Sequence, residues 1–402
     1  MEICKWYNNA NSPVVFMIDD LANVWVDVNN NGKIDFEEDW GYAGFAENSA
    51  FNYLKNNILE NFEDIKVTFF VPVGKRVGMI RNSKIKSISK PINESIESKK
   101  FFSSINNSSK YEIAYHGTNH GKVGKTNHDF IQEWELFNSV EEANLKTKEG
   151  IDIYLDALGE KPLGGKYCGY MSNEFSDYSI DQLNFLWWCR FCNLDTEAAF
   201  KENRLIKEFH GIDTNFITNN DIKTFGKNNV IDIPTTVNGG LLTGIYSKSG
   251  NLVKKLSKAL LCEILVSKKL KLIDSLIKNK LVISIQEHIS PSRDDGRRQT
   301  PNIYDDRKSL ITIFNYLKDK NIWNCTCSEL ASYVYYRDNI KLNISENGFE
   351  TNFNCLEKYK YNYITIRFKN IKKLETPSGE ILRNSNGIFN IRLENGKYKY
   401  IY

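Results

Sequence analysis

Short apolar runs alternate with longer stretches in which apolar residues recur at helical spacing. This alternation constrains the fold more than any other feature of the chain, because it is typical of a parallel sheet with helical crossovers. The hydrophobic content of 41% in 402 residues is enough for a sizeable folded core. The expected strands cover residues 14–18, 66–73, 112–115, 230–234 and 281–285, and the expected helices cover 48–59, 130–158, 252–277 and 307–317.

Polar residues with catalytic potential follow several of these expected strands. Asp19 and Asp20 end the first strand, His116 follows the third, and His288 follows the fifth. In α/β barrels the chemistry lies at the carboxyl ends of the strands. We therefore expect these side chains to share one site although they are far apart in the sequence.

His116 and His120 stand four residues apart in a chain with only five histidines. Two imidazoles and one carboxylate are a common ligand set for a catalytic divalent metal with open coordination positions. Neighbouring strand residues point to opposite faces, so one of Asp19 and Asp20 is expected to bind the metal while the other acts as a base. The alternative is that these residues are ordinary loop and cap residues.

Residues 27–38 fit the twelve-residue calcium loop of an EF-hand, with oxygen-bearing side chains at the five expected positions and Gly32 at position six. The first expected strand leaves no room for the preceding helix, so we expect an isolated calcium loop. The alternative is a turn that its own side-chain hydrogen bonds hold together. The expected ligands are Asp27, Asn29, Asn31, the Lys33 carbonyl, Asp35 and Glu38.

Composition argues against several other classes of protein. The net charge of +3 gives no sign of a nucleic-acid partner. No apolar run is long enough to span a bilayer, and the N-terminus lacks the pattern of a secretory leader. We expect a cytoplasmic protein, unless a leader has been removed. The eight cysteines, among them Cys189 with Cys192 and Cys325 with Cys327, lack zinc-site spacing and are expected to be buried free thiols.

The pattern of the chain changes near its C-terminal end. After residue 338, short alternating runs are separated by turn residues, which predicts a small antiparallel β domain over 339–402 that follows a barrel over 1–338. Within the barrel, residues 75–110 are rich in Lys, Ser and Asn, and we expect an irregular insertion there.

The runs at 16–20, 66–71, 116–120, 282–288 and 322–330 resemble, in order, the motifs of NodB-type polysaccharide deacetylases, which form carbohydrate esterase family 4. The resemblance covers roughly residues 10 to 338. It implies a deformed (β/α)7 barrel and a metal-dependent hydrolase, with zinc the expected metal, that removes N-acetyl groups from a carbohydrate. It would make Asp19 the base, Asp20, His116 and His120 the metal ligands, and His288 the general acid.

The chain departs from this family at two motifs. Leu21 stands where the first motif normally has glycine, and residues 166–170 replace an Arg-x-Pro-Tyr-Gly run. By this resemblance Lys166 would orient the base, but as a point charge rather than a bidentate fork. Tyr167 and Tyr170 would contact substrate, and Trp188 either contacts substrate or belongs to the core. Arg293, in a loop with three arginines, either grips an acidic group of the substrate or is solvated.

The weak third motif keeps two alternatives open. One is a catalytically silent relative that binds glycans in the same cleft, and the other is a hydrolase of a different C–N or ester bond. The sequence leaves the oligomeric state open.

Overall fold

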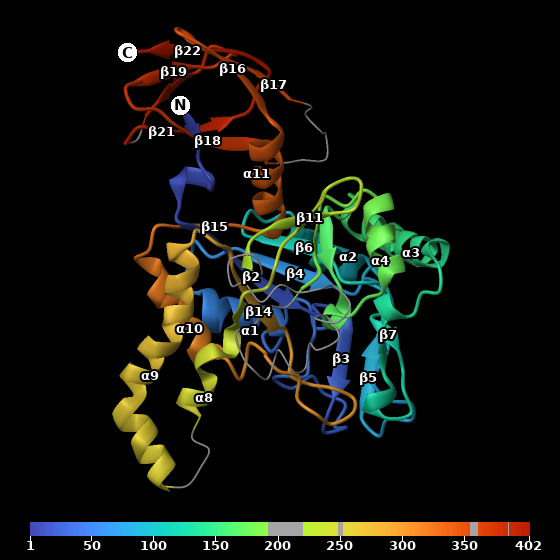
Figure 1. Cartoon of the computed structure of the whole chain (residues 1–402). Helices are drawn as coiled ribbons and strands as arrows, with labels where there is room; N and C mark the ends of the chain where they lie inside the picture. Colours follow the sequence, from blue (N-terminus) through green and yellow to red (C-terminus); the bar gives the residue numbers. More distant parts are fainter. Residues whose placement is uncertain (192–219, 248–251, 354–360, 385) are drawn as a thin grey trace.

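The computed structural model describes residues 1–191, 220–247, 252–353, 361–384 and 386–402, with residues 252–260 described by their backbone only. A ten-stranded sheet forms its centre (Figure 1). Every neighbouring pair is parallel except β11 with β12, and the expected α/β class is confirmed. In spatial order the strands are β11 (Lys223–Phe225), β12 (Val230–Asp232), β10 (Trp187–Cys189), β9 (Gly164–Lys166), β6 (Tyr111–Tyr115), β4 (Val67–Val71), β2 (Ser12–Asp19), β14 (Ile283–His288) and β13 (Val237–Asn238), with β15 (Ile322–Asn324) beside the start of β2.

The order of the strands brings the expected site residues to one edge of the sheet. His288 at the end of β14 lies in register with Asp19 at the end of β2. On the other side of β2, Asp19 lies opposite Phe70 of β4, and β4 is followed by β6, after which His116 comes. Since these strands are parallel, their carboxyl ends meet and carry the site.

Helices connect these strands, and side-chain caps mark where several of them begin. Ser49 and Ser95 each accept a hydrogen bond from a backbone N–H in the first turn of α1 and of α2. The helices are α1 (Ala50–Leu54), which continues as the π-helical turn η2 (Lys55–Leu59), α2 (Ile96–Asn106), α3 (Val140–Leu158), α4 (Glu174–Gln182), α8 (Thr243–Tyr246), α9 (Leu252–Lys278), α10 (Arg307–Lys318) and α11 (Cys327–Asn339).

Two expectations for individual elements were wrong. The helix expected from residue 130 begins at Val140, because Ser139 caps it and the preceding residues form the short strand β8 (Ile131–Gln132) against β7 (Gly121–Lys122). The segment 75–110 is not irregular. It contains β5 (Lys86–Ser89), which pairs with β3 (Val24–Asp27), and the helix α2, whose Phe101, Phe102 and Ile105 are buried.

The C-terminal part is a small antiparallel β structure, as expected. A five-stranded sheet has the order β16 (Lys341–Ser345), β17 (Gly348–Asn352), β22 (Gly396–Ile401), β19 (Lys373–Glu375) and β20 (Ile381–Arg383). A three-stranded sheet joins β18 (Tyr363–Arg367) and β21 (Ile388–Arg392) to β1 (Glu2–Ile3). The N-terminus therefore lies in this region with the C-terminus (Figure 1).

One apolar cluster runs from the inner face of the large sheet into the C-terminal sheets. Val15, Met17 and Phe70 of the large sheet belong to the same buried cluster as Ile364 and Ile366 of β18. Asp19 follows Val15 and Met17 at strand spacing, so it continues their face at the end of β2.

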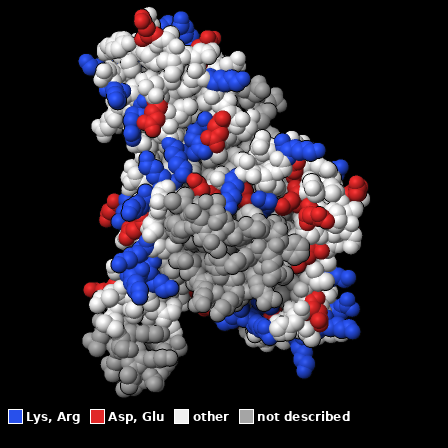
Figure 2. Space-filling model, in the orientation of Figure 1, with Lys and Arg blue, Asp and Glu red and all other residues white. Residues whose placement is uncertain are grey.

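Three observations concern the expectations from composition. The six cysteines within the described residues are free, and five of them are buried, while Cys192 and Cys355 lie outside those residues. On the face shown in Figure 2, lysines and arginines are interspersed with acidic residues. Over the described part of the chain, no helix is both long and apolar enough to cross a membrane.

Candidate metal centre

The structure brings Asp19, Asp20, His116 and His120 together at the carboxyl ends of β2 and β6. The Asp20 N–H donates to the Phe70 carbonyl at 2.8 Å, so β4 fixes the chain where it leaves β2. All four side chains are buried. Asp20 and His120 have φ values of 70° and 72°, in the left-handed region that side chains other than glycine rarely adopt. Such backbone strain is typical of functional sites.

The donor atoms around His120 fit a transition metal. His120 Nε2 lies 3.1 Å from Asp20 Oδ1. Ligand atoms of His116, His120 and Cys168 all lie within 4.8 Å of one another. Two ligands of one tetrahedral zinc ion, each about 2.0 Å from it, lie about 3.3 Å apart. Within the described residues, Asp20 Oδ1 and His120 Nδ1 are buried without a hydrogen-bond partner. Unsatisfied buried donors and acceptors of these types suit zinc or a similar ion.

His116 is prepared to act as a neutral ligand. Burial lowers its pKa to about 4, against the opposing effect of Asp19, so the ring is neutral at neutral pH. Its Nδ1 lies 2.9 Å from the Lys166 carbonyl, which favours the tautomer with the proton on Nδ1. Nε2 then presents its lone pair, and it lies 3.9 Å from Asp19 Oδ2.

Glu133 fixes the backbone between the two histidines. Its carboxylate accepts hydrogen bonds from the N–H groups of Thr118, Asn119 and His120 at 2.8, 2.6 and 2.6 Å. The sequence analysis did not identify Glu133. Its position in the 3₁₀ turn η4 (Glu133–Glu135) follows no local pattern that links it to the histidine loop.

Asp19 is held by two buried side chains from other strands. Lys166 Nζ donates to Asp19 Oδ1 at 2.7 Å, and Gln286 Nε2 donates to Asp19 Oδ2 at 2.9 Å. Gln286 Oε1 accepts from Lys166 and, at 2.8 Å, from the Tyr170 hydroxyl. Lys166 thus lies where the resemblance implied. Gln286 was missed, although a polar residue two positions before His288 in an apolar run is a usable signal.

The charges at this edge keep both aspartates ionised. Burial raises the pKa of Asp19, but Lys166, His116 and His288 outweigh it, and the net pKa is lowered. Burial also opposes ionisation of Asp20, yet His120 and Arg76 hold its pKa well below the usual range. Arg76 Nε lies 3.5 Å from Asp20 Oδ1, with its guanidinium 4.4 Å from the centre of the Trp40 ring. Arg76 is a second residue that the sequence analysis missed.

His288 lies at the edge of the site and is partly exposed. Its Nδ1 is 2.7 Å from the Pro301 carbonyl, which fixes the ring and leaves Nε2 as the atom that can exchange a proton. The parallel pairing of β14 with β2 places His288 beside Asp19.

The four residues expected to contact substrate are placed differently from one another. Tyr167 and Trp188 are fully buried and their rings contact each other, 5.3 Å between centroids, so they form part of the core and present no surface to a substrate. Tyr170 contacts Gln286 inside the site and not an open surface. Arg293 forms a two-point ion pair with Asp295, at 3.0 and 2.6 Å, which occupies its guanidinium.

The twelve-residue loop 27–38 begins at Asp27, the last residue of β3. Its polar side chains form hydrogen bonds within the loop itself. Asp27 accepts from the N–H groups of Asn31 and Gly32, both at 2.9 Å, and Asp35 Oδ2 accepts from the Asn29 and Asn31 amides, both at 2.8 Å. Glu38 is buried and accepts from the Val28 N–H at 2.9 Å.

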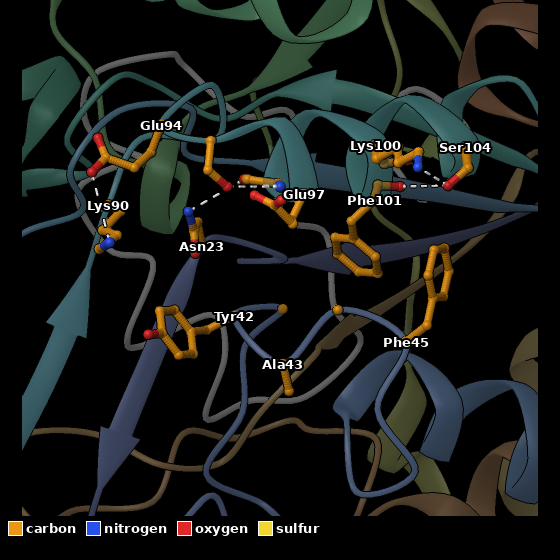
Figure 3. A pocket seen from close by; sticks show the side chains of 14 residues that line it. Asn23, Tyr42, Ala43, Phe45, Lys90, Glu94, Glu97, Lys100, Phe101 and Ser104 are labelled. Carbon is orange, nitrogen blue, oxygen red and sulfur yellow. Dashed lines mark hydrogen bonds and ion pairs between the residues drawn. The ribbon is translucent and has the colours of Figure 1, made fainter.

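The pocket drawn in Figure 3 does not contain the site. It has a volume of about 720 Å³ and lies between α2 and the loop 41–45. Tyr42, Phe45 and Phe101 line its apolar part, and Lys90 and Glu94 form an ion pair at its margin (Figure 3).

No family model and no curated protein matches the chain. Solved structures do. A protein described as a polysaccharide deacetylase from Pseudomonas aeruginosa PAO1 is 12% identical with a TM-score of 0.47, and one from Mycobacterium smegmatis is 13% identical with a TM-score of 0.44. Each match covers 84% of this chain and 95% of the other.

A family 4 acetyl xylan esterase from Clostridium thermocellum, in complex with a cobalt ion, is 10% identical with a TM-score of 0.32. This match covers 79% of this chain and 90% of the other. At such identities the likeness concerns the fold alone.

Proposed function

We propose that the chain is a metal-dependent hydrolase that removes N-acetyl groups from a carbohydrate. One observation carries the proposal. An ionised carboxylate, Asp19, is held by Lys166 beside two histidines with free ring nitrogens, and a third histidine ends the adjacent strand. A base, a metal-ligand pair and an acid in one site are the parts that amide hydrolysis needs.

His116 and His120 would hold the metal, with Asp20 beside them as the ligand that the sequence predicts. A bound divalent metal would lower the pKa of a water molecule and polarise the acetyl carbonyl. Zinc suits the nitrogen-rich donor set.

The side chains of the protein divide the proton transfers. Asp19 accepts a proton from the attacking water, and Lys166 and Gln286 keep its carboxylate ionised and oriented. His288 donates a proton to the sugar nitrogen as the C–N bond breaks, so acetate and a free amine leave. The N–H groups of Tyr167 and Tyr170 already donate to backbone carbonyls, so those of Cys168 and Gly169 are the candidates for stabilising the oxyanion.

The test is acetate release from an oligosaccharide of N-acetylglucosamine by the metal-loaded protein. We expect Asp19→Asn to lower kcat about 10²–10⁴-fold, the usual contribution of a general base, and His116→Ala to abolish activity. Glu135→Gln, a carboxylate variant outside the site, serves as the matched control. Full activity in Asp19→Asn and His116→Ala would disprove the assignment.

A catalytically silent glycan-binding relative is the second candidate. The ion pair between Arg76 and Asp20 favours it, because a fixed cation beside the expected ligands opposes a divalent ion. Binding of the oligosaccharide without any acetate release, in protein that contains metal, would support this candidate.

We also propose that the loop 27–38 binds calcium and stiffens the rim of the site. Support comes from the agreement of all five side-chain positions with the calcium pattern and from the buried carboxylates of Asp27 and Glu38.

A further inference from the structure

The pocket between α2 and the loop 41–45 takes no part in the metal centre, yet it has the features of a binding site (Figure 3). Its volume of about 720 Å³ lies in the range of roughly 300–1,000 Å³ that is usual for pockets that bind small molecules. Phe45, which is 54% exposed, and the half-buried Tyr42 line it. Two aromatic rings that share one pocket offer an apolar surface that a ligand can cover.

Other aromatic side chains hold these two rings in place. The Tyr42 ring is stacked on Trp25, with 6.3 Å between the centroids and 25° between the planes. The Phe45 ring meets Phe101 edge to face at 5.0 Å, and it meets Phe51 in the same way at 5.7 Å. Because the rings are fixed before a ligand binds, binding costs little of their conformational freedom.

The backbone of the loop 41–45 is fixed as well. The buried carboxylate of Asp39 accepts a hydrogen bond from the Ala43 N–H at 2.8 Å. The side-chain amide of Asn52 donates to the Phe45 carbonyl at 2.7 Å. The pocket is therefore largely formed in the protein without a ligand, as binding pockets usually are.

The wall that faces this loop is polar, and its charges cancel (Figure 3). It carries two lysines and two glutamates, namely Lys90, Lys100, Glu94 and Glu97, and Lys90 Nζ lies 3.7 Å from Glu94 Oε1. Because these groups have no net charge together, the pocket gives no preference to an anionic or a cationic ligand. A neutral ligand with polar groups is therefore the expected occupant.

Asn23 adds a fixed hydrogen-bonding group to this pocket. Its Nδ2 donates to the Pro91 carbonyl at 3.1 Å and to the Ser98 hydroxyl at 3.3 Å. Within the described residues its Oδ1 accepts no hydrogen bond, so this oxygen is available to a hydroxyl group of a ligand.

A neutral sugar matches both walls of the pocket. The C–H groups on the face of a sugar ring pack against aromatic rings, and its hydroxyl groups bond to amides, ammonium groups and carboxylates. A fatty acyl chain would leave the polar wall unpaired, and a phosphate would gain no net attraction. Resting on the proposed carbohydrate function, we propose that the pocket is a second carbohydrate-binding site, which holds a neutral segment of the polymer while another segment reaches the metal centre.

The pocket and the metal centre are neighbours along the chain. Asn23 lies three residues after Asp20, and Trp40 directly precedes the loop 41–45. The Trp40 ring packs on the guanidinium of Arg76, which pairs with Asp20. A polymer that is bound in the pocket stays close to the metal centre, which raises the effective concentration of its other segments there.

Hydrogen–deuterium exchange of the full-length, metal-loaded Asp19→Asn protein locates the binding site without turnover. The probe is a hexasaccharide of N-acetylglucosamine. We expect it to slow exchange in peptides that cover the loop 41–45 and α2. Phe45→Ala, added to Asp19→Asn, should raise the concentration of hexasaccharide that gives half of this protection by about tenfold, the effect of losing about 1.4 kcal/mol of contact with one ring.

Tyr42→Ala is a second variant of the pocket, so the test does not depend on one substitution. Tyr178→Ala is the matched control, because Tyr178 is 56% exposed on α4 and does not line the pocket. It should keep the protection of the parent protein. In protein with an intact Asp19, Phe45→Ala should raise KM more for the hexasaccharide than for the disaccharide, since the shorter substrate cannot fill both sites.

The outcomes separate this proposal from the proposed function. Protection of the loop 116–120 alone would overturn the second site and leave the deacetylase assignment standing. Protection of the pocket, in a wild type that releases no acetate, would support the second site and overturn that assignment. Equal protection in the parent, Phe45→Ala and Tyr42→Ala proteins would overturn the second site. Protection of the pocket by octanoate and not by the hexasaccharide would overturn it as well.

Discussion

Lys166 and Gln286 hold the carboxylate of Asp19 from two sides, and neither is close to Asp19 in the sequence. A buried carboxylate without such partners would take up a proton and could not act as a base. The amide of Gln286 donates to Asp19 while its oxygen accepts from Lys166 and Tyr170, so one neutral side chain links the base to the rest of the site.

Replacing Gln286 with glutamate tests this link. A second carboxylate beside Asp19 raises the pKa of the pair, because like charges oppose ionisation. Asp19 must be ionised to act, and its pKa is lowered in the wild type. We therefore expect the acid limb of the pH profile of kcat/KM to move to higher pH in Gln286→Glu. Gln182→Glu, at an exposed position of α4, is the control, and an acid limb that stays in place in Gln286→Glu would contradict the role of Gln286.

The sequence predicted the site residues that directly follow strands. It missed the residues of other elements whose side chains contact them. Asp19, Asp20, His116 and His288 could be identified because each ends an apolar run. Arg76, Glu133 and the role of Gln286 depend on contacts between elements that the order of the sheet creates. Tyr167 was assigned to substrate from its motif position, but neighbouring aromatic rings bury it. For Trp188 the sequence left substrate and core open, and the same rings bury it in the core.

Successive side chains of β14 point to opposite faces of the sheet. Gln286 and His288 face the site, and Glu287 between them points to the opposite side of the sheet. Glu287 is fully buried, and within the described residues neither of its carboxylate oxygens has a hydrogen-bond partner. Burial, and next the charge of Asp306, raises its pKa well above the ordinary value of 4.5.

This raised pKa predicts a pH-dependent cost in stability. Below pH 4.5 the carboxyl is protonated in both the folded and the unfolded chain, and it costs nothing. Above pH 4.5 the unfolded chain ionises while the folded chain keeps the proton, so stability falls as pH rises toward the folded pKa. We expect Glu287→Gln to raise the free energy of unfolding relative to the wild type by up to about 1.4 kcal/mol for each pH unit above 4.5.

Urea unfolding of both proteins at pH 4.5, 6 and 7.5 measures this difference. An advantage of the glutamine variant that does not grow with pH would show that Glu287 is not protonated in the folded chain. Glu47→Gln, at an exposed position, controls for the substitution.

Calcium binding by the loop 27–38 would change the stability of the protein. Its carboxylates accept hydrogen bonds from the loop itself, and calcium would replace these bonds with coordination to oxygen. We expect calcium, and not magnesium at the same concentration, to raise Tm, with about 2.7 kcal/mol of added stability at a concentration 100 times Kd. Glu38→Gln should remove the response.

Glu37→Gln is the matched control, because Glu37 lies next to the pattern and pairs with Arg298. A thermal scan that is the same with and without calcium would exclude the calcium site.

Elements such as β5 show the limit of prediction from the sequence for single elements. Its side chains are exposed or half-buried, so no apolar run marks it, and pairing with β3 alone makes it a strand.

In the whole molecule, the large sheet and the C-terminal sheets share one buried cluster. Ile366 of β18 and Val15 of β2 belong to it, and β1 ties the N-terminus to β18. The sequence predicted two regions with a boundary near residue 338, and their separate β patterns are present. It could not predict that the N-terminal residues would join the C-terminal sheet, because two residues form no pattern.

The shared cluster predicts that the two regions unfold together. We expect a single thermal transition for the full chain, and we expect Ile366→Ala to lower its midpoint, with a loss of about 2–5 kcal/mol for a buried isoleucine. Ile381→Ala, at an exposed position of β20, is the control. Two separate transitions, with only one of them shifted in Ile366→Ala, would show that the regions fold independently.

The metal content of the purified full-length protein, measured by elemental mass spectrometry, tests the central claim most directly. We predict about one zinc-like ion per chain in the wild type after dialysis against trace zinc, and almost none in the double variant His116→Ala, His120→Ala. His128→Ala, in an exposed turn away from the site, should keep the ion. A wild type that retains no transition metal, or a double variant that retains as much as the wild type, would contradict the account.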